Sequence, residues 1–270
     1  MKIAAIQMIS TPNIAENMAT AQRLMVSAVD AGARLLLLPE YWPLMGMHET
    51  DKLSVAEPAG HGQLHYFLAN MAKMLDVWVI GGTIPLQSHE ESKVLNTTLV
   101  FNPQGTLEAR YDKMHLFGFR KGDESYEEAR TISAGDQVVS VDTEVGRVGL
   151  SICYDLRFPE LYRAMGNCSL IVVPAAFTYT TGQAHWEILL RSRAIENQCY
   201  VLASAQGGKH ANGRRTWGHS MLIDPWGKIV SEFSEGEGIV IGELDTALIH
   251  SVRESLPALQ HRRLKSESMS

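Results

Sequence analysis

Two predominantly aliphatic runs that each lead into a proline constrain the fold of this 270-residue chain more than any other feature. The first is Leu35–Leu38, which is followed by Pro39 and Glu40, and the second is Ser169–Val173, which is followed by Pro174. Runs of this kind lack the alternation of a half-exposed strand, so we expect strands that are covered on both faces. The chain must therefore fold into layers, with helices covering buried strands.

The sequence around these two runs predicts a duplicated plan. In each half, one amphipathic helix precedes the proline-terminated strand, and a second helix and another strand follow it. Each half then closes with a hairpin whose turn reads Asn/Asp-Pro-x-Gly, at 102–105 and at 224–227. Each half is thus expected to have the order β-α-β-α-β-β. Hairpins favour mixed sheets, but the pattern permits either two sheets packed face to face or one doubly wound sheet.

No linker or low-complexity stretch separates the two halves, so we expect one domain over residues 1–264 and a disordered, solvated tail at 265–270. A composition of 45% hydrophobic and 20% charged residues is typical of a soluble globular enzyme. The net charge is −6 and Lys and Arg are not clustered, which argues against a nucleic-acid or anionic-membrane partner.

The chain also shows no targeting or spanning segment. Its N-terminus lacks the apolar core of a signal peptide, and no apolar run reaches the roughly 18 residues that a membrane span needs. Three cysteines without a CxxC pair argue against a disulfide framework or a zinc ribbon. We therefore expect a cytoplasmic protein with reduced thiols and no membrane partner.

Three ionisable residues directly follow predicted strands: Glu40, Lys113 and Cys153. Strand ends converge on one edge in α/β proteins, where sites are usually built. A cysteine attacks as the thiolate, and a nearby cation lowers its pKa. A carboxylate can accept the proton and later activate water. An ammonium group, with the backbone N–H of Tyr154 as a second donor, can hold the charge that develops on an attacked carbonyl oxygen.

Each of these residues also has a common structural role. A buried cysteine often fills a core, a glutamate after a strand often forms a cap or an ion pair, and a lysine after a hairpin is often solvated. Spacing alone therefore leaves the catalytic hypothesis open.

Three sequence blocks resemble, in this order, the signature blocks of the nitrilase superfamily of carbon–nitrogen hydrolases: Leu38–Tyr41, Tyr111–Leu116 and Ile152–Leu161. The resemblance extends from about Lys2 to Val252 and includes the turn at 224–227. It implies a four-layer α-β-β-α sandwich of two mixed sheets with an internal pseudo-two-fold repeat. It also implies assembly as a homodimer or a larger homo-oligomer.

The resemblance implies a role for each candidate residue. Glu40 is expected to be the general base, Lys113 the oxyanion stabiliser and proton donor, and Cys153 the nucleophile. Glu128 is similar to the second glutamate of the family, which helps to orient substrate and Lys113, and the adjacent Glu127 is the alternative. The implied reaction is a two-step acyl transfer through a thioester, without a metal or an organic cofactor.

The segments 178–187, 193–200 and 213–220 are most similar to the deaminated glutathione amidase branch of this superfamily. We therefore expect hydrolysis of deaminated glutathione to 2-oxoglutarate and cysteinylglycine. The sister branch, the omega-amidases, cleaves 2-oxoglutaramate through the same 2-oxoglutaryl thioester and releases ammonia, so this reaction is the alternative. A non-catalytic scaffold on the same fold is a third hypothesis.

The anionic acyl group of either substrate requires a cation in the pocket. Arg157 lies close to Cys153 in sequence, and a guanidinium can hold a carboxylate through two hydrogen bonds. Its alternative role is a structural ion pair with Asp155 or Glu160. Phe177 and Thr178 are expected to line the pocket wall.

One segment departs from the pattern of these relatives. After the residues that correspond to His115, Leu116 and Phe117, these relatives commonly carry acidic residues, whereas here the segment 118–121 reads Gly-Phe-Arg-Lys, with Gly118, Phe119, Arg120 and Lys121. This departure predicts a more basic pocket rim.

Overall fold

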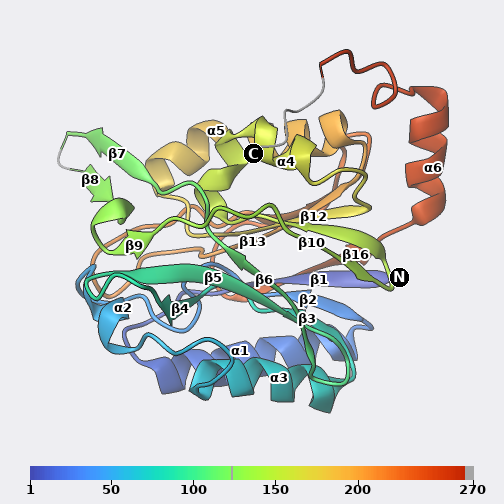
Figure 1. The fold of residues 1–270 in the computed structure, drawn as a ribbon. Helices are drawn as coiled ribbons and strands as arrows, with labels where there is room; N and C mark the ends of the chain where they lie inside the picture. The colour runs from blue at the N-terminus through green and yellow to red at the C-terminus, as the bar shows by residue number, and fades with distance from the viewer. Residues whose placement is uncertain (123, 265–270) are drawn as a thin grey trace.

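The structure, a computed structural model, describes residues 1–122 and 124–264, so the expected tail at 265–270 lies outside the described residues. In the described chain, two large mixed sheets pack face to face and helices cover the outer face of each (Figure 1). The four-layer α-β-β-α arrangement is therefore confirmed, and the alternative of one doubly wound sheet is excluded.

The first large sheet has eight described strands, with the order β16-β1-β2-β3-β5-β4 and with β6 and β9 also paired to β5. Its strands are β1 (Lys2–Gln7), β2 (Leu35–Leu37), β3 (Trp78–Ile80), β4 (Ile84–Gln87), β5 (Val94–Phe101), β6 (Leu107–Asp112), β9 (Ile132–Ser133) and β16 (Gly238–Glu243). Helices α1 (Ile14–Asp30) and α3 (Gln63–Leu75) cover its outer face (Figure 1).

The second large sheet has six described strands in the order β10-β11-β12-β13-β14-β15. Its strands are β10 (Ser140–Thr143), β11 (Gly146–Leu150), β12 (Leu170–Ala175), β13 (Tyr200–Ala205), β14 (Ser220–Ile223) and β15 (Ile229–Phe233). Helices α4 (Pro159–Ala164) and α5 (Tyr179–Asn197) cover it on the outside (Figure 1).

The remaining elements lie at the margins. They are the short helix α2 (Asp51–Ser54), the projecting hairpin of β7 (Gly118–Lys121) and β8 (Glu124–Glu127), the 3₁₀ helices η1 (Glu128–Arg130) and η2 (Cys153–Arg157), and α6 (Thr246–Ser255). No helix within the described ranges is both long and apolar enough to cross a membrane.

The internal repeat is visible in the strand pairing. In the first sheet, β1, β2 and β3 pair parallel, and β5 and β6 follow antiparallel. In the second sheet, β11, β12 and β13 pair parallel, and β14 and β15 follow antiparallel. The two sheets therefore share one topology, which confirms the duplicated plan.

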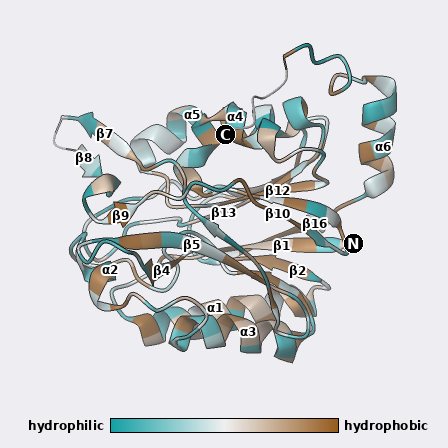
Figure 2. Ribbon diagram, in the orientation of Figure 1, coloured by the Kyte–Doolittle hydropathy of each residue, from teal (hydrophilic) through white to brown (hydrophobic). Residues whose placement is uncertain are grey.

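Alternating side chains of the inner strands fill two separate layers of core. Ile3 and Ala5 of β1 belong to the cluster between the sheets, whereas Ala4 and Ile6 pack against the cluster beneath α1 and α3. Successive side chains of a strand point to opposite faces, so a strand between two layers must be apolar on both. Hydrophobic residues accordingly run along the strands of both inner layers (Figure 2).

Helix α5 begins at Tyr179, earlier than the start at His185 that the sequence predicted. Its first turn contains Thr180, Thr181 and Gly182, which are poor helix formers and carry no apolar periodicity. The turn forms because the Thr178 side chain accepts a hydrogen bond from the backbone N–H of Thr181. Strand β4, the β7–β8 hairpin and α6 were not predicted from the sequence.

Gly82, just after β3, controls how closely the chain approaches Pro39 and Glu40. Its φ is +56°, and a Cβ atom there would lie 2.2 Å from the carbonyl oxygen of Pro39. A side chain at this position would displace the segment that carries Glu40, since a real Cβ contact cannot be so short.

We expect Gly82→Ala to destabilise the protein more than Gly60→Ala and to lower kcat. Both glycines have a left-handed φ, which costs an L-residue about 1–2 kcal/mol. At Gly60 no described atom lies within 4 Å of the added Cβ, so only this conformational cost applies. At Gly82 overpacking adds roughly 1–3 kcal/mol. Urea denaturation measures the difference, and equal losses of unfolding free energy would show that the Pro39 contact is unimportant.

Candidate active site

The strand ends that carry Glu40, Lys113 and Cys153 meet at one edge of the sandwich. Strand β6 is antiparallel to β5, which is antiparallel to β3, so β6 ends at the same edge as β2 and β3. Strand β11 brings Cys153 to this edge from the second sheet. The side chains of Glu40 and Lys113 are 1% and 0% exposed, so both charges are removed from bulk water.

The ammonium group of Lys113 lies between two carboxylates. Its Nζ donates hydrogen bonds to Glu40 Oε1 at 2.9 Å and to Glu128 Oε1 and Oε2 at 2.9 and 2.7 Å. Burial alone would lower the pKa of Lys113, but the charges of Glu128 and Glu40 outweigh burial and raise this pKa above its usual value. Lys113 is therefore a fixed, permanent cation.

Glu40 is held in one orientation by donors on both oxygens. Asn96 Nδ2 donates to Oε1 at 2.9 Å, and the backbone N–H of Ala176 donates to Oε2 at 2.8 Å. Ala176 directly follows β12, so this bond joins the two sheets at the site. The carboxylate is thus oriented before any substrate enters.

The structure places Glu128, rather than Glu127, against Lys113. Besides Lys113, Glu128 accepts hydrogen bonds from the Tyr41 hydroxyl and the Phe117 N–H, both at 2.8 Å. Burial would raise the pKa of Glu128, but the charge of Lys113 outweighs burial and lowers it. The neighbouring Glu127 is 55% exposed and pairs with Arg130. Glu128 is therefore the carboxylate that fixes Lys113.

Cys153 sits in a sharp turn at the start of η2, where its φ is +49°. Asp155 stabilises this turn by accepting hydrogen bonds from the Ile152 N–H at 2.9 Å and the Tyr111 hydroxyl at 2.7 Å. His115 also binds Asp155, through its backbone N–H at 3.0 Å and through Nδ1 at 2.7 Å. Asp155 thereby ties the cysteine turn to the segment that carries Lys113. A left-handed φ outside glycine is strained and is common at functional positions.

Lys113 lowers the pKa of the Cys153 thiol, as expected of a nearby cation, but other effects outweigh it and the pKa is raised overall. Burial raises this pKa most, and the charge of Glu40 raises it further, against the opposing effect of Lys113. Burial and the two nearby carboxylates together therefore outweigh the ammonium group. The resting group is therefore a thiol, which needs a base before it can attack.

A narrow pocket opens onto the cysteine. It is lined by Glu40, Phe117, Glu128, Cys153, Tyr154, Arg157, Ala176, Phe177, Thr178, Thr181 and Arg214. Tyr154, Arg157, Phe177 and Thr178 thus lie around the same pocket as Glu40 and Cys153.

Arg157 is held over the pocket by aromatic rings. Its guanidinium lies 5.7 Å from the centre of the Tyr154 ring and 5.5 Å from that of Phe177, and its Nη1 is 3.3 Å from His185 Nδ1. No ion pair joins Arg157 to Asp155 or Glu160 within the described residues, because Asp155 is bound by Tyr111 and His115. Arg157 therefore does not form the structural ion pair that was its alternative role.

Arg214 is a pocket residue that the sequence did not identify. Its Nη2 donates to the carbonyl oxygen of Ala176 at 3.0 Å, and its guanidinium lies 5.1 Å from the centre of the Tyr126 ring. The adjacent Arg215 points outward and pairs with Glu235. The sequence shows two arginines side by side in a loop without periodicity, so it carries no signal for which one faces the pocket.

The expected basic rim has a different origin from the one predicted. Arg120 and Lys121 are exposed on the projecting β7–β8 hairpin and are not among the residues that line the pocket. The hairpin instead contributes Phe117 at its base. The positive charge beside the cysteine comes from Arg157 and Arg214.

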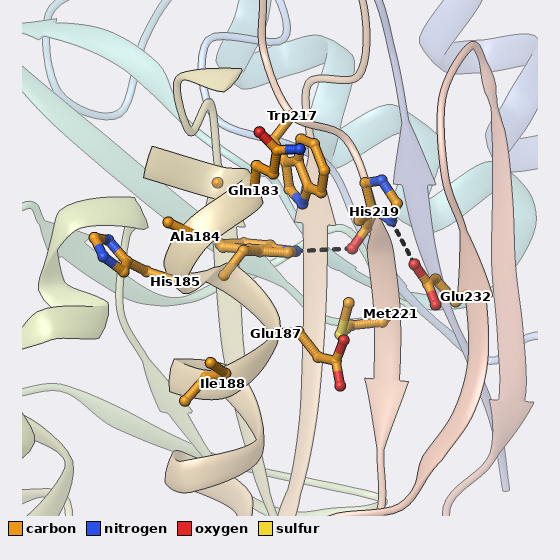
Figure 3. Close-up of a pocket in the computed structure, with 11 residues that line it drawn as sticks. Gln183, Ala184, His185, Glu187, Ile188, Trp217, His219, Met221 and Glu232 are labelled. Carbon is orange, nitrogen blue, oxygen red and sulfur yellow. Dashed lines mark hydrogen bonds and ion pairs between the residues drawn. The ribbon is translucent and has the colours of Figure 1, made fainter. Parts of the chain in front are cut away.

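A second groove, of about 220 Å³, lies between the start of α5 and strands β14 and β15 (Figure 3). It contains Trp217 stacked on His219, which in turn pairs with Glu232. His185 belongs to this groove and contacts Arg157, so the groove adjoins the catalytic pocket. Across residues 1–122 and 124–264, no group of three or more His, Cys, Asp or Glu side chains is arranged to hold a metal ion.

Comparison with known sequences gives one consistent result. The carbon–nitrogen hydrolase domain matches residues 2–254. A deaminated glutathione amidase of Synechocystis is 43% identical over 96% of this chain and 97% of its own length. A deaminated glutathione amidase of Yersinia enterocolitica is 39% identical over 98% of this chain and 93% of its own.

Comparison with solved structures agrees. Nit3 of Saccharomyces cerevisiae, described as a member of branch 10 of the nitrilase superfamily, is 33% identical and has a TM-score of 0.87 over 98% of this chain and 97% of its own. The family match over nearly the whole length, the similar fold and the three sequence blocks all indicate the same family. This chain belongs to the carbon–nitrogen hydrolase family, within the nitrilase superfamily.

Proposed function

We propose that this protein hydrolyses a small carboxylate-bearing amide through a thioester on Cys153, with deaminated glutathione as substrate. The observation that carries this proposal is the buried Glu40–Lys113–Glu128 set beside Cys153, in a pocket whose walls carry Arg157 and Arg214. Relatives with 39–43% identity are named deaminated glutathione amidase, which supports deaminated glutathione as the substrate.

In the first step, Sγ of Cys153 attacks the amide carbon while Glu40 takes the thiol proton. Because the pKa of the thiol is raised, the proton must move during the attack. The carbonyl oxygen becomes negative and is stabilised by the ammonium group of Lys113 and by the N–H of Tyr154. Glu128 acts as a positioning residue, since it holds Lys113 and does not react.

In the second step, the carbon–nitrogen bond breaks and the nitrogen leaves as an amine after receiving the proton from Glu40. Lys113 was expected to be a proton donor, but its raised pKa favours Glu40 in this role. Water then loses a proton to Glu40 and attacks the thioester carbon. The carboxylate product departs, and the proton on Glu40 returns to the thiol of Cys153.

The acyl carboxylate is assigned to Arg157, which has no carboxylate partner among the described residues and faces the pocket. A charge-assisted guanidinium–carboxylate pair orients the acyl chain across the pocket, with Phe177 and Thr178 as its wall.

2-Oxoglutaramate would form the same thioester, so an omega-amidase is the second candidate. A scaffold is disfavoured because burying a cation between two carboxylates is costly and serves no purpose in a scaffold.

We expect Glu40→Gln to lower the pKa of Cys153 and yet to slow acylation. Loss of the carboxylate removes a charge that raises the thiol pKa and leaves Lys113 to lower it. Acylation should still fall by about 10²–10⁴-fold, since the general base is lost. Ultraviolet titration of the thiolate, with Cys153→Ala as the blank, measures the pKa. A burst of released amine at the wild-type rate would exclude Glu40 as the base.

We expect the wild-type protein to hydrolyse deaminated glutathione with a higher kcat/KM than 2-oxoglutaramate. Arg157→Gln should lower kcat/KM for both by about 10–100-fold, because they share the acyl carboxylate. Arg147→Gln, in an exposed position of β11, is the matched control and should leave both unchanged. Failure of the wild-type protein to hydrolyse either amide would refute the substrate proposal.

We also propose a homodimeric, cytoplasmic protein whose residues 1–264 form one domain. Ile188 and Ile195 of α5 and Trp226 of the β14–β15 turn are 67%, 50% and 62% exposed, and Ile195 packs close to Gly227, beside Trp226. Exposed apolar side chains gathered on one helix and its neighbour are typical of an interface. The three cysteines are free, as a reducing compartment would keep them.

The interface proposal predicts a dimer by light scattering, and Ile195→Glu should shift the population toward the monomer, because the introduced charge would be buried at the contact. Val138→Glu, an exposed apolar position ahead of β10, is the control and should leave the dimer intact. A wild-type monomer at micromolar concentration would contradict this assignment.

A further inference from the structure

We infer that Arg214 binds the carboxylate of the leaving amine, in a groove that extends the catalytic pocket on the Glu40 side. This inference rests on the proposed function and concerns the leaving amine, which is the part in which deaminated glutathione and 2-oxoglutaramate differ. Cysteinylglycine carries a carboxylate, whereas ammonia does not. Arg214 would therefore be the residue that selects the larger amide.

The first observation is an unused donor on Arg214. Its Nε is buried and has no hydrogen-bond partner among the described residues, and no described carboxylate forms an ion pair with its guanidinium. The Ala176 carbonyl and the Tyr126 ring fix the group in place. A buried donor without an acceptor is unfavourable, and a carboxylate can accept two parallel bonds from a guanidinium. The group is thus prepared for an anion that the protein itself does not supply.

The second observation is the side of the pocket on which Arg214 lies. The N–H of Ala176 donates to Glu40 Oε2 at 2.8 Å, and its carbonyl oxygen accepts from Arg214 Nη2 at 3.0 Å. The backbone of Ala176 therefore bonds both residues and places Arg214 next to Glu40. Arg157 lies instead over Tyr154 and Phe177, toward His185.

The chemistry assigns each arginine to one end of the substrate. Glu40 gives its proton to the leaving nitrogen, so this nitrogen must face Glu40. The carbonyl oxygen faces Lys113, and the acyl chain takes the remaining direction, toward Arg157. The rest of the amine continues from the nitrogen past Glu40, where Arg214 is the adjacent cation.

The third observation is a shallow groove beyond Arg214. Arg214 lines this groove together with Tyr41, Met45, His48, Lys52 and Asn212. Arg214 lines the catalytic pocket as well, and the Tyr41 hydroxyl binds Glu128 of that pocket, so the groove adjoins the pocket. The far end of a dipeptide amine would point toward this groove, whereas ammonia has no part that could reach it.

The test compares three amides that share the 2-oxoglutaryl group: deaminated glutathione, its C-terminal carboxamide, and 2-oxoglutaramate. The first two have the same size and differ only in the charge of the leaving amine. We expect the wild-type protein to prefer the acid over the carboxamide by about 10–100-fold in kcat/KM. Arg214→Gln should abolish this preference, mainly through KM, and should lower kcat/KM for 2-oxoglutaramate much less than for deaminated glutathione. Arg214→Lys should restore part of it.

Arg215→Gln is the matched control, since this adjacent arginine points outward, and it should keep the wild-type preference. An equal loss for all three amides in Arg214→Gln would overturn the inference, because it would assign Arg214 to the acyl group or to the fold. No change for any amide would overturn it as well. If Arg214→Gln does not fold, equal wild-type activity on acid and carboxamide refutes the inference. Wild-type protein inactive on all three would refute the proposed function itself.

Discussion

The rest of the site depends on one buried cation, Lys113, held between Glu40 and Glu128. An ammonium group removed from water is stable only when carboxylates replace its hydration, so both glutamates must lie close to it. This requirement joins β2, β6 and η1 at one edge of the first sheet. It also explains the state of Cys153. Burial and the charge of Glu40 outweigh the stabilisation that Lys113 gives to a thiolate, so the protein keeps a thiol and a base beside it.

The same edge gives the pocket its direction. Ala176 links Glu40 to Arg214 through its N–H and its carbonyl oxygen, while Arg157 stands on the opposite wall above Phe177. In the proposed reaction, Glu40 thus lies between Arg157, which binds the acyl carboxylate, and Arg214, which binds the carboxylate of the leaving amine. The duplicated topology makes this possible, since equivalent strand ends of two facing sheets supply Glu40 and Ala176.

Much of the fold followed from the sequence, because its determinants are local. Continuous apolar runs marked the buried strands, and the Asn/Asp-Pro-x-Gly turns marked the two hairpins. Glu40, Lys113 and Cys153 became candidates because each directly follows a predicted strand, and the family resemblance implied their roles. Other features depend on three-dimensional context. The orientation of Glu128 rather than Glu127 follows from the short η1 turn, and the inward position of Arg214 rather than Arg215 follows from an irregular loop. The sign of the thiol pKa shift depends on burial and on three neighbouring charges together.

In the proposed reaction the acyl group is carried by Cys153, and an acyl-enzyme can be trapped by acid quenching during turnover, followed by digestion and mass spectrometry. We expect a 2-oxoglutaryl thioester on the peptide that contains Cys153, with the same added mass from deaminated glutathione and from 2-oxoglutaramate. An acyl group found on another residue, or continued hydrolysis by Cys153→Ala, would contradict it.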